Sequence, residues 1–391
     1  MVLSLRPSPL GDDFVGVDRI GEPQPCYPID CYLCRECGHL QLLDVPDPEE
    51  LFRNYTYRTS VSLGLVEHFG SYAWHAVESL AIRKGSLVVE IGSNDGSLLK
   101  AFKTEGMEVL GIDPAREIAM QAISEGVPTI PEFFSHRLAL DIVRDHGKAS
   151  LICANNVFAH IDDMEDIATG IRSLLEPDGV FIFEVSYIVD MIDHMAFDTI
   201  YHEHISYHAL TPLEKFLNQH DLTIFDAVRV QTKGGSVRVF AQPRVTGKRR
   251  RRNAVLDLLA EEDRRGICNP EIYQEWGEAI DGLKRDVMAY IDGAIAAGKT
   301  VAAYGASTTT TMLLYHFELE NRIWFLVDDN PAKRDKFSPG AHIPVFDPTA
   351  LVDMKPDVVV ILAWLYADKI KRRNADYVAQ GGTFFNPIKA A

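Results

Sequence analysis

The stretch "SLVVEIGSNDGSLLKAF", residues 86–102, decides the fold of the chain. It begins with a short apolar run typical of a buried strand, continues through a turn that contains Gly92 and Gly96, and ends in a helical segment. The next segment, "EVLGIDPA" at 108–115, predicts a second strand that ends at Asp113. A strand, a glycine turn, a helix and a strand in this order indicate one βαβ half of a parallel sheet.

The same alternation of strands and helices continues along the chain and predicts two Rossmann-like α/β units. The chain of 391 residues is too long for one hydrophobic core, so we expect two or three domains. An antiparallel hairpin around Gly234 and Gly235 is expected to close the first unit, and the basic segment "GKRRRRN" at 247–253 marks a boundary. We expect further strands within residues 149–161, 179–187, 299–307, 323–331 and 356–364.

These patterns predict three domains. Residues 1–56 are rich in Pro, Gly and Cys and read as a small irregular domain. Residues 57–246 hold the first α/β unit, and residues 247–391 hold the second.

Composition excludes several classes of partner. The net charge of −17 argues against nucleic acid and anionic membranes as partners. The sequence has no apolar run of transmembrane length and no signal-peptide pattern at its N-terminus, so we expect a cytoplasmic protein. No feature of the sequence indicates an oligomeric state.

Four of the six cysteines lie within twelve residues near the N-terminus. In a reducing compartment such a cluster favours a metal site over disulfides. Cys34 and Cys37 have the C-x-x-C-G form of half a zinc knuckle, which supplies two of the four ligands that a structural zinc ion needs. Cys26 and Cys31 are badly spaced for a second pair, so buried free cysteines are the alternative.

The turn at 90–97 resembles the first motif of class I S-adenosylmethionine (SAM) methyltransferases. Glycines allow the backbone to approach a ligand at the end of the first strand, and Asp113 stands where a carboxylate binds two ribose hydroxyls. The turn is not G-x-G-x-x-G and lacks the lysine of a phosphate loop, which favours a cofactor without a pyrophosphate. The residues that we expect around the cofactor are Glu90, Gly92, Asn94, Asp95, Asp113, Phe134 and Asn155.

The segment "YHEHISYHAL" at 201–210 concentrates groups that transfer protons. Methylation of carbon requires a base to remove a proton beside a carbonyl, and donors that stabilise the resulting oxyanion. A histidine titrates in the right range for that base, and a tyrosine can donate to the oxyanion. Exposed histidines at a helix start, or a metal site, are the alternatives, although the order H-E-x-x-H is absent.

Over nearly its whole length the chain resembles sugar C-methyltransferases that act on nucleotide-linked 4-keto-deoxysugars. The resemblance lies in motifs that occur in the family's order: "CRECGHLQL", "PEELFRNYTYRTS", "VEIGSNDGSLL", "ANNVFAHI", "YHEHISYHAL", "KGGSVRVF", "SPGAHIPV" and "ILAW". It implies a zinc-binding N-terminal module, a SAM domain and a C-terminal Rossmann-like domain. It also implies a dTDP- or GDP-linked keto-sugar as substrate and a place in deoxysugar biosynthesis.

The resemblance also implies roles for individual residues. His204 matches the base that removes the sugar's C-3 proton, with Tyr201 and His160 stabilising the enolate. Glu203 and Tyr55 match positions that line the sugar, and Tyr55 would bring the N-terminal domain over the site. The residues implied at the rest of the substrate are Lys233, Gly234, Gly235, Ser236, Arg238, Tyr304 and Ser307.

Two other functions stay open at this point. The second α/β unit, with one glycine in its turn and Asp328 at ribose-binding spacing, is compatible with an NAD-binding sugar-nucleotide oxidoreductase or epimerase. Relatives carry Lys, Gly and Asn in the turn at 305–313, where this chain reads "GASTTTTML". That change leaves a non-catalytic methyltransferase relative as the third hypothesis.

Overall fold

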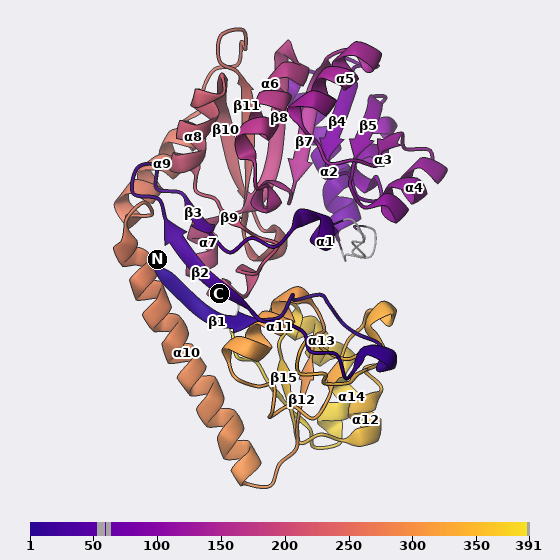
Figure 1. The fold of residues 1–391 in the computed structure, drawn as a ribbon, viewed down its shortest axis with the longest axis vertical. Helices are drawn as coiled ribbons and strands as arrows, with labels where there is room; N and C mark the ends of the chain where they lie inside the picture. Colours follow the sequence, from indigo (N-terminus) through magenta and orange to yellow (C-terminus); the bar gives the residue numbers. More distant parts are fainter. Residues whose placement is uncertain (53–58, 60–63, 389–391) are drawn as a thin grey trace.

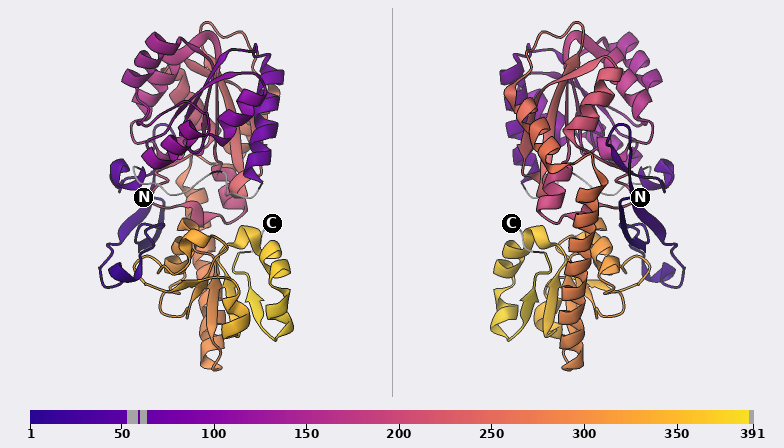
Figure 2. Two further views of the ribbon diagram at one scale, coloured as in Figure 1. Left: turned by 90° about the vertical axis from the view of Figure 1, so that its right-hand side faces the viewer. Right: turned by 90° about the vertical axis from the view of Figure 1, so that its left-hand side faces the viewer.

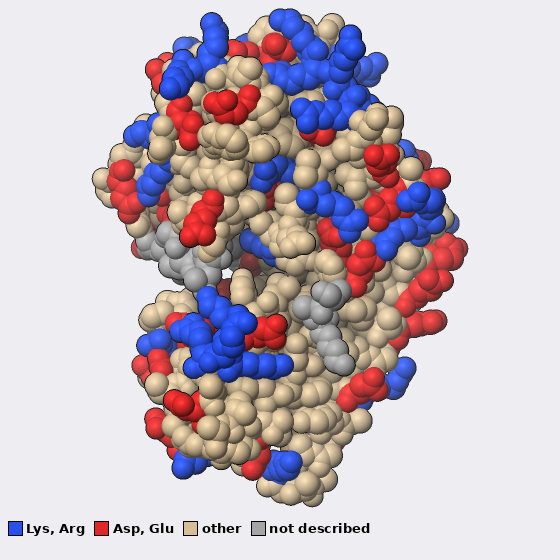
Figure 3. All heavy atoms as spheres, turned by 180° about the vertical axis from the view of Figure 1, so that it is seen from behind, with Lys and Arg blue, Asp and Glu red and all other residues tan. Residues whose placement is uncertain are grey.

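The computed structural model describes residues 1–52, 59 and 64–388, which form two α/β lobes linked by a small antiparallel sheet and one long helix (Figures 1 and 2). The upper lobe contains a seven-stranded sheet and its helices, and the lower lobe contains a five-stranded sheet and its helices. Helix α10 (Pro270–Ala296) runs beside the small sheet from one lobe to the other. The space-filling view shows a hollow between the two lobes (Figure 3).

The sheet of the upper lobe has the order β10-β11-β8-β7-β4-β5-β6. Its strands run parallel except for β11, which lies antiparallel to both of its neighbours. The strands are β4 (Leu87–Ile91), β5 (Glu108–Ile112), β6 (Thr129–Ile130), β7 (Ala149–Asn155), β8 (Leu175–Ser186), β10 (Leu222–Val230) and β11 (Ser236–Pro243).

Helices cover both faces of this sheet because successive strand residues point in opposite directions. Val88 packs with Phe69 and Leu98 on the side of α2 and α3, whereas Val89 packs with Leu138 and Ile171 on the side of α5 and α6. The helices are α2 (Leu65–Leu80), α3 (Ser97–Thr104), α4 (Arg116–Ser124), α5 (His136–His146), α6 (Met164–Leu174), α7 (Ile188–Asp193), α8 (Leu210–Gln219) and α9 (Asn253–Arg265).

The lower lobe repeats this arrangement in an all-parallel sheet of order β14-β13-β12-β15-β16. Val358 and Val360 pack on the side of α10 and α11, and Val359 packs on the side of α12, α13 and α14. The elements are β12 (Val301–Tyr304), α11 (Thr308–His316), β13 (Leu326–Val327), β14 (Val345–Phe346), α12 (Ala350–Met354), β15 (Val358–Ile361), α13 (Ala367–Arg373), α14 (Ala375–Ala379) and β16 (Thr383–Phe385).

The two sheets confirm the predicted α/β fold with two Rossmann-like units. The domain boundaries at 56 and 246 stay an interpretation. Helix α9 lies beyond the second boundary, yet it packs against β10 of the upper lobe.

The N-terminal residues, which we expected to be irregular, form strands β1 (Leu3–Ser8), β2 (Tyr27–Leu33) and β3 (Leu40–Leu42), followed by helix α1 (Pro48–Phe52). Alternate residues such as Leu3 and Leu5 are buried, which gives this sheet a hydrophobic face. Its fourth strand is β9 (Ser206–Tyr207), so the sheet reaches into the segment that carries the candidate base.

The segment after β1 crosses to the lower lobe. The Thr311 hydroxyl donates to the carbonyl of Gly11 at 2.8 Å, and Lys333 forms an ion pair with Asp12 at 2.5 Å. The N-terminal residues therefore contact both lobes. Across the described ranges, no helix combines the length and apolar character needed to span a bilayer.

Candidate active site

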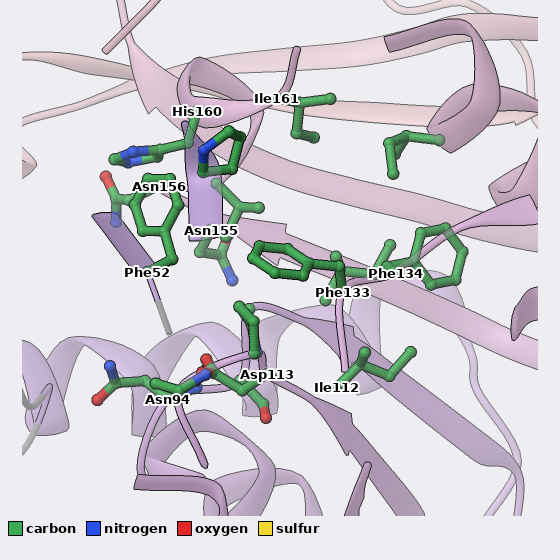
Figure 4. Close-up of a pocket in the computed structure, with 18 of the residues that line it drawn as sticks. Phe52, Asn94, Ile112, Asp113, Phe133, Phe134, Asn155, Asn156, His160 and Ile161 are labelled. Carbon is green, nitrogen blue, oxygen red and sulfur yellow. The ribbon is translucent and has the colours of Figure 1, made fainter. Parts of the chain in front are cut away.

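A cavity of about 450 Å³ lies at the carboxyl ends of β4 and β7 (Figure 4). These two strands are neighbours, and the chain leaves them toward opposite edges of the sheet. Such a switch point is where open α/β sheets bind ligands. Figure 4 shows Asn94 and Asp113 on one side of the cavity, with Phe52, Asn156 and His160 across from them. The size and position suit a ligand of cofactor dimensions.

The glycine turn after β4 is held in shape by Asp113. The backbone N–H of Asn94 donates to one carboxylate oxygen at 2.8 Å, and that of Ala115 donates to the other at 2.9 Å. Gly92 has a φ of +69°, and a Cβ there would stand 2.3 Å from a methyl carbon of Val157. Burial raises the pKa of Asp113, although both hydrogen bonds oppose that shift.

Two further polar side chains in the cavity wall have atoms that a ligand could satisfy. Within the described part of the chain, Oε2 of Glu90 and Nδ2 of Asn155 are buried without a hydrogen-bond partner. Burial, followed by the negative charges of Asp113 and Asp95, raises the pKa of Glu90 well above its ordinary value. The unpaired carboxyl oxygen of Glu90 and NH₂ group of Asn155 fit the hydroxyl groups of SAM, which both donate and accept hydrogen bonds.

The other cofactor candidates divide into two groups. Gly92, Asn94 and Phe134 line the cavity, and Phe133 lines it beside Phe134 (Figure 4). Asp95 is absent from the wall. Its carboxylate accepts from the backbone N–H of Ser97 at 3.2 Å and from the hydroxyl at 2.6 Å, which fixes the start of α3.

Tyr201 and His204 form a hydrogen-bonded pair in the same cavity. Nδ1 of His204 lies 2.8 Å from the carbonyl oxygen of Thr199, and a carbonyl only accepts, so Nδ1 carries the proton. Nε2 therefore carries a lone pair, and it accepts a hydrogen bond from the Tyr201 hydroxyl at 2.8 Å. The two rings stack with centroids 4.0 Å apart, which fixes their mutual orientation.

The environment keeps His204 neutral. Burial lowers its pKa well below the ordinary value for histidine, and the proximity of His160 and the charge of Lys233 act in the same direction. The His160 ring lies 4.8 Å from that of His204, and burial lowers the pKa of His160 to about 4. Both imidazole rings are thus uncharged at neutral pH, as a general base requires.

The backbone around His204 is held by three elements. The N–H of Ile205 donates to the carbonyl of Ala159 at 2.8 Å, and its own carbonyl accepts from the N–H of Leu42 at 2.9 Å. Residues 206 and 207 then continue as β9 beside β3. The base is therefore anchored to both the upper lobe and the N-terminal sheet.

Glu203, the other ionisable candidate in this segment, lies outside the cavity wall. It is buried, and burial together with the charge of Asp12 raises its pKa to about 7, against the opposing charges of Lys333 and Lys233. Glu203 thus faces the ion pair between the N-terminal segment and the lower lobe.

Of the candidates in residues 233–238, only Lys233 lines the cavity. Arg238 forms an ion pair with Glu184 and lies over the ring of Tyr72 at 4.0 Å from its centroid. Ser236 donates to the carbonyl of Thr232 at 3.0 Å. Gly234 and Gly235 shape the turn and contribute no side chain.

Tyr304 and Ser307 lie in the lower lobe, away from this cavity. Ser307 caps α11 by accepting from the N–H of Thr310 at 3.4 Å. Asp328 accepts from the N–H groups of Ala306 at 2.6 Å and Asn330 at 2.7 Å, in the same pattern as Asp113. No described residue after Lys233 lines the cavity.

The structure adds wall residues that the sequence did not single out. Phe52 of α1 packs edge-on against His160 with ring centroids 5.3 Å apart. The N–H of Thr59 donates to the side-chain oxygen of Asn94 at 2.9 Å. Phe52 of α1 and Thr59 thus border the cavity, whereas Tyr55 lies outside the described residues. The motif "PEELFRNYTYRTS" contains Phe52 and was the feature of the sequence that could have identified this residue.

Cys34 and Cys37 occupy a tight turn between β2 and β3. The N–H of Gly38 donates to the carbonyl of Cys34 at 2.9 Å. Cys31 is buried and Cys26 is exposed, and neither completes a set with this pair. Among the described residues, no group of three or more Cys, His, Asp or Glu could hold a metal ion. The residues present thus supply two zinc ligands, fewer than a structural site needs.

Comparison with known proteins gives three family matches and one full-length relative. Residues 67–227 match a model described as a methyltransferase domain, and residues 231–388 match a C-methyltransferase C-terminal domain. Residues 1–52 match a model described as a zinc binding domain, which supports the prediction that this N-terminal module is of the zinc-binding type. The C-methyltransferase NovU of Streptomyces niveus is 35% identical over 388 residues, which cover 99% of this chain and 92% of NovU.

Solved structures are similar to part of the chain only. Magnesium protoporphyrin IX methyltransferase from Synechocystis, with bound SAM, has 17% identity and a TM-score of 0.35, covering 46% of this chain and 79% of that one. A SAM-dependent methyltransferase from Clostridium acetobutylicum has 13% identity and a TM-score of 0.37, covering 47% and 92% respectively.

Proposed function

The chain belongs to the SAM-dependent C-methyltransferases, and from that membership we propose that it methylates the carbon beside the ketone of a nucleotide-linked 4-keto-deoxysugar. The nucleotide would be dTDP or GDP. A role in deoxysugar biosynthesis follows from this choice of substrate.

The observation that carries the proposal is the hydrogen-bonded pair of Tyr201 and His204 beside the glycine turn. Methyl transfer to oxygen or nitrogen needs a lone pair on the substrate, but carbon becomes a nucleophile only after it loses a proton. A neutral imidazole with its lone pair pointed at a phenol in the cofactor cavity supplies such a base.

The proton path follows from the tautomer of His204. The Tyr201 oxygen takes the proton from the carbon beside the ketone while its own proton passes to Nε2 of His204. The C–H bonding pair moves into an enolate, with negative charge on the former ketone oxygen. His204 becomes an imidazolium whose Nδ1–H donates to Thr199 throughout.

When bound, SAM would supply a sulfonium methyl group as the electrophile for the enolate carbon, and the electron pair of the broken S–C bond would remain on sulfur. The protein's share is to hold the sugar carbon in line with that methyl. Such positioning supplies roughly 7–11 kcal/mol of barrier lowering. Asp113 and the turn at 92–94 would hold the cofactor's ribose end, and Phe52 and His160 would flank the sugar.

The test uses dTDP-4-keto-6-deoxyglucose and GDP-4-keto-6-deoxymannose. With SAM, mass spectrometry should show a gain of one methyl group on one of them. With S-adenosylhomocysteine in D₂O, the same sugar should exchange the proton beside its ketone. His204→Asn should abolish both signals while calorimetry shows unchanged binding of S-adenosylhomocysteine.

His146→Asn, at an exposed histidine near the end of α5, is the matched control and should leave both signals unchanged. Turnover retained by His204→Asn would exclude the assigned base. Binding of NAD by the wild type, without methyl transfer, would favour the oxidoreductase or epimerase. If the wild type shows no methyl gain and no deuterium exchange with either sugar, the result would favour a non-catalytic relative.

A further inference from the structure

We propose that Lys233 is a catalytic residue whose ammonium group stabilises the negative charge on the enolate oxygen. This inference rests on the proposed function and assigns a task within it that differs from contact with the substrate's phosphates. The argument draws on where Lys233 lies, how its backbone is held, and which charges surround it.

Lys233 is the sole lysine or arginine among the described residues of the cavity wall. It comes from η5 (Thr232–Gly234), the turn between β10 and β11, and enters the cavity that also contains Tyr201 and His204. One cation and the candidate base therefore line the same cavity.

The backbone of Lys233 adopts a conformation that is uncommon for a residue with a side chain. Its φ of 51° and ψ of 33° lie in the left-handed region, where most non-glycine residues are disfavoured. Non-glycine residues in this region persist only where their surroundings fix them. Glycine would adopt this geometry freely, so the presence of lysine points to a use for its side chain.

The neighbouring contacts fix this turn tightly. The N–H of Gly235 donates to the carbonyl of Thr232 at 3.0 Å, and Nδ1 of His194 donates to the carbonyl of Gly234 at 2.6 Å. A Cβ on Gly234 would lie 3.4 Å from Leu365 of the lower lobe. These hydrogen bonds hold the backbone of the turn that carries Lys233.

Electrostatic coupling connects Lys233 to the base. The charge of Lys233 contributes to lowering the pKa of both His160 and His204. The negative charges of Glu184 and Glu203 favour the ammonium form of Lys233. Lys233 has exposed surface in this structure, so its charge acts with little screening once a bound substrate covers it.

These features match the charge changes of the reaction. Before proton transfer, the ammonium disfavours an imidazolium and keeps His204 available as a base. During transfer, negative charge appears on the ketone oxygen, and a positive charge at the cavity wall stabilises it. The cation thus acts on the state that forms during the reaction more than on the substrate.

The shape of the substrate separates this role from phosphate binding. In a 4-keto-hexopyranose the diphosphate leaves C-1, across the ring from the ketone at C-4. Lys233 lines the same cavity as the pair that deprotonates the carbon next to C-4, so we assign it to the ketone end of the sugar.

The experiment compares Lys233→Met with Lys233→Arg, using the full chain and dTDP-4-keto-6-deoxyglucose. We expect Lys233→Met to lower kcat for proton exchange and for methyl transfer by about 10²–10³, the usual cost of losing one oxyanion donor. Its Kd for dTDP and for S-adenosylhomocysteine should stay within twofold of the wild type. Lys233→Arg, which keeps the charge, should recover part of kcat.

Lys299→Met removes an exposed lysine before β12 and serves as the matched control, with wild-type rates expected. A Lys233→Met enzyme with unchanged kcat, or one whose defect is a weaker Kd for dTDP, overturns the role at the enolate while leaving the proposed function intact. A wild-type enzyme that neither exchanges nor methylates any keto-sugar overturns the proposed function, and this inference with it.

Discussion

The indole N–H of Trp364 donates a hydrogen bond of 2.8 Å to the carboxylate of Asp198, and both side chains are buried. Trp364 belongs to the lower lobe, in η7 (Trp364–Tyr366), and Asp198 lies in η4 (Phe197–Thr199), just before the Tyr201–His204 pair. Burial raises the pKa of Asp198 to about 7, and the bond from Trp364 opposes that shift. The second lobe is thereby connected to the segment that carries the base.

Trp364→Phe should destabilise the protein by about 1–3 kcal/mol, because it leaves a buried carboxylate without its donor. The loss of folding stability caused by Trp364→Phe should be larger at higher pH. Since the folded pKa of Asp198 exceeds the unfolded value, the folded state binds the extra proton between about pH 4 and 7, and stability falls as pH rises through that window. Without the indole N–H, the ionised Asp198 carboxylate destabilises the folded state more.

Urea unfolding at pH 5.5 and 8 measures this effect. The control is Trp324→Phe, at a residue that is 49% exposed, which should change stability little at either pH. Equal deficits for Trp364→Phe at both pH values would contradict the role of the ionised carboxylate.

Tyr201→Phe tests the proton path. It removes the hydroxyl that donates to Nε2 of His204 but keeps the ring that stacks on the imidazole at 4.0 Å. We expect deuterium exchange beside the ketone to slow by about 10²–10⁴, the usual contribution of a positioned acid or base. Tyr290→Phe, at a partly exposed tyrosine on α10, is the control. Exchange at the wild-type rate would show that His204 acts without Tyr201.

The pH dependence of exchange should reflect the lowered pKa of His204. An unshifted histidine would be half protonated near pH 6.5 and would lose half its activity as a base there. We therefore expect kcat/KM for exchange to stay constant from pH 8 down to 6.5. Lys233→Met should move the acid limb to higher pH, because the lysine's charge helps to lower the pKa of His204. A wild-type profile that is half-maximal at pH 6.5 or above would contradict both expectations.

Local patterns in the sequence predicted the central strands of the two sheets, because strands such as β4 and β15 are largely apolar runs. Val88 and Val89 of β4 pack toward opposite faces, so helices cover both sides of that strand. β9 has only two residues, and its pairing with β3 joins positions 40 and 207. Nothing local marks such a strand, so the N-terminal sheet was not expected.

For the candidate site, the sequence indicated which side chains have suitable chemistry more reliably than where those side chains lie. Arg238 has the charge of a substrate ligand, but it stands opposite Glu184 in the register of β11 and β8 and forms an ion pair with it. Asp95 lies in the glycine turn, where a short carboxylate can either bind a cofactor or bond to the backbone, and here it accepts hydrogen bonds from Ser97, the first residue of α3. Phe52 reaches the cavity through tertiary contact with His160, which no spacing encodes.

Asp113→Asn tests the cofactor half of the site. Asp113 accepts one N–H on each carboxylate oxygen, and an amide offers one oxygen and one NH₂ group, so the turn loses a charge-assisted hydrogen bond. The ribose would lose the acceptor proposed for its hydroxyls as well. At about 1.5–3 kcal/mol for one such bond, Kd for S-adenosylhomocysteine should rise roughly 10- to 100-fold.

Calorimetry with S-adenosylhomocysteine isolates this effect from turnover, because that ligand carries no transferable methyl group. Asp141→Asn changes a carboxylate on α5 that pairs with Arg144 on the surface, and it should bind like the wild type. If Asp113→Asn binds within twofold of the wild type, the cofactor's ribose does not depend on this carboxylate. A thermal unfolding curve of each variant without ligand separates lost binding from a distorted turn, since a local hydrogen bond to ligand leaves the unliganded midpoint unchanged.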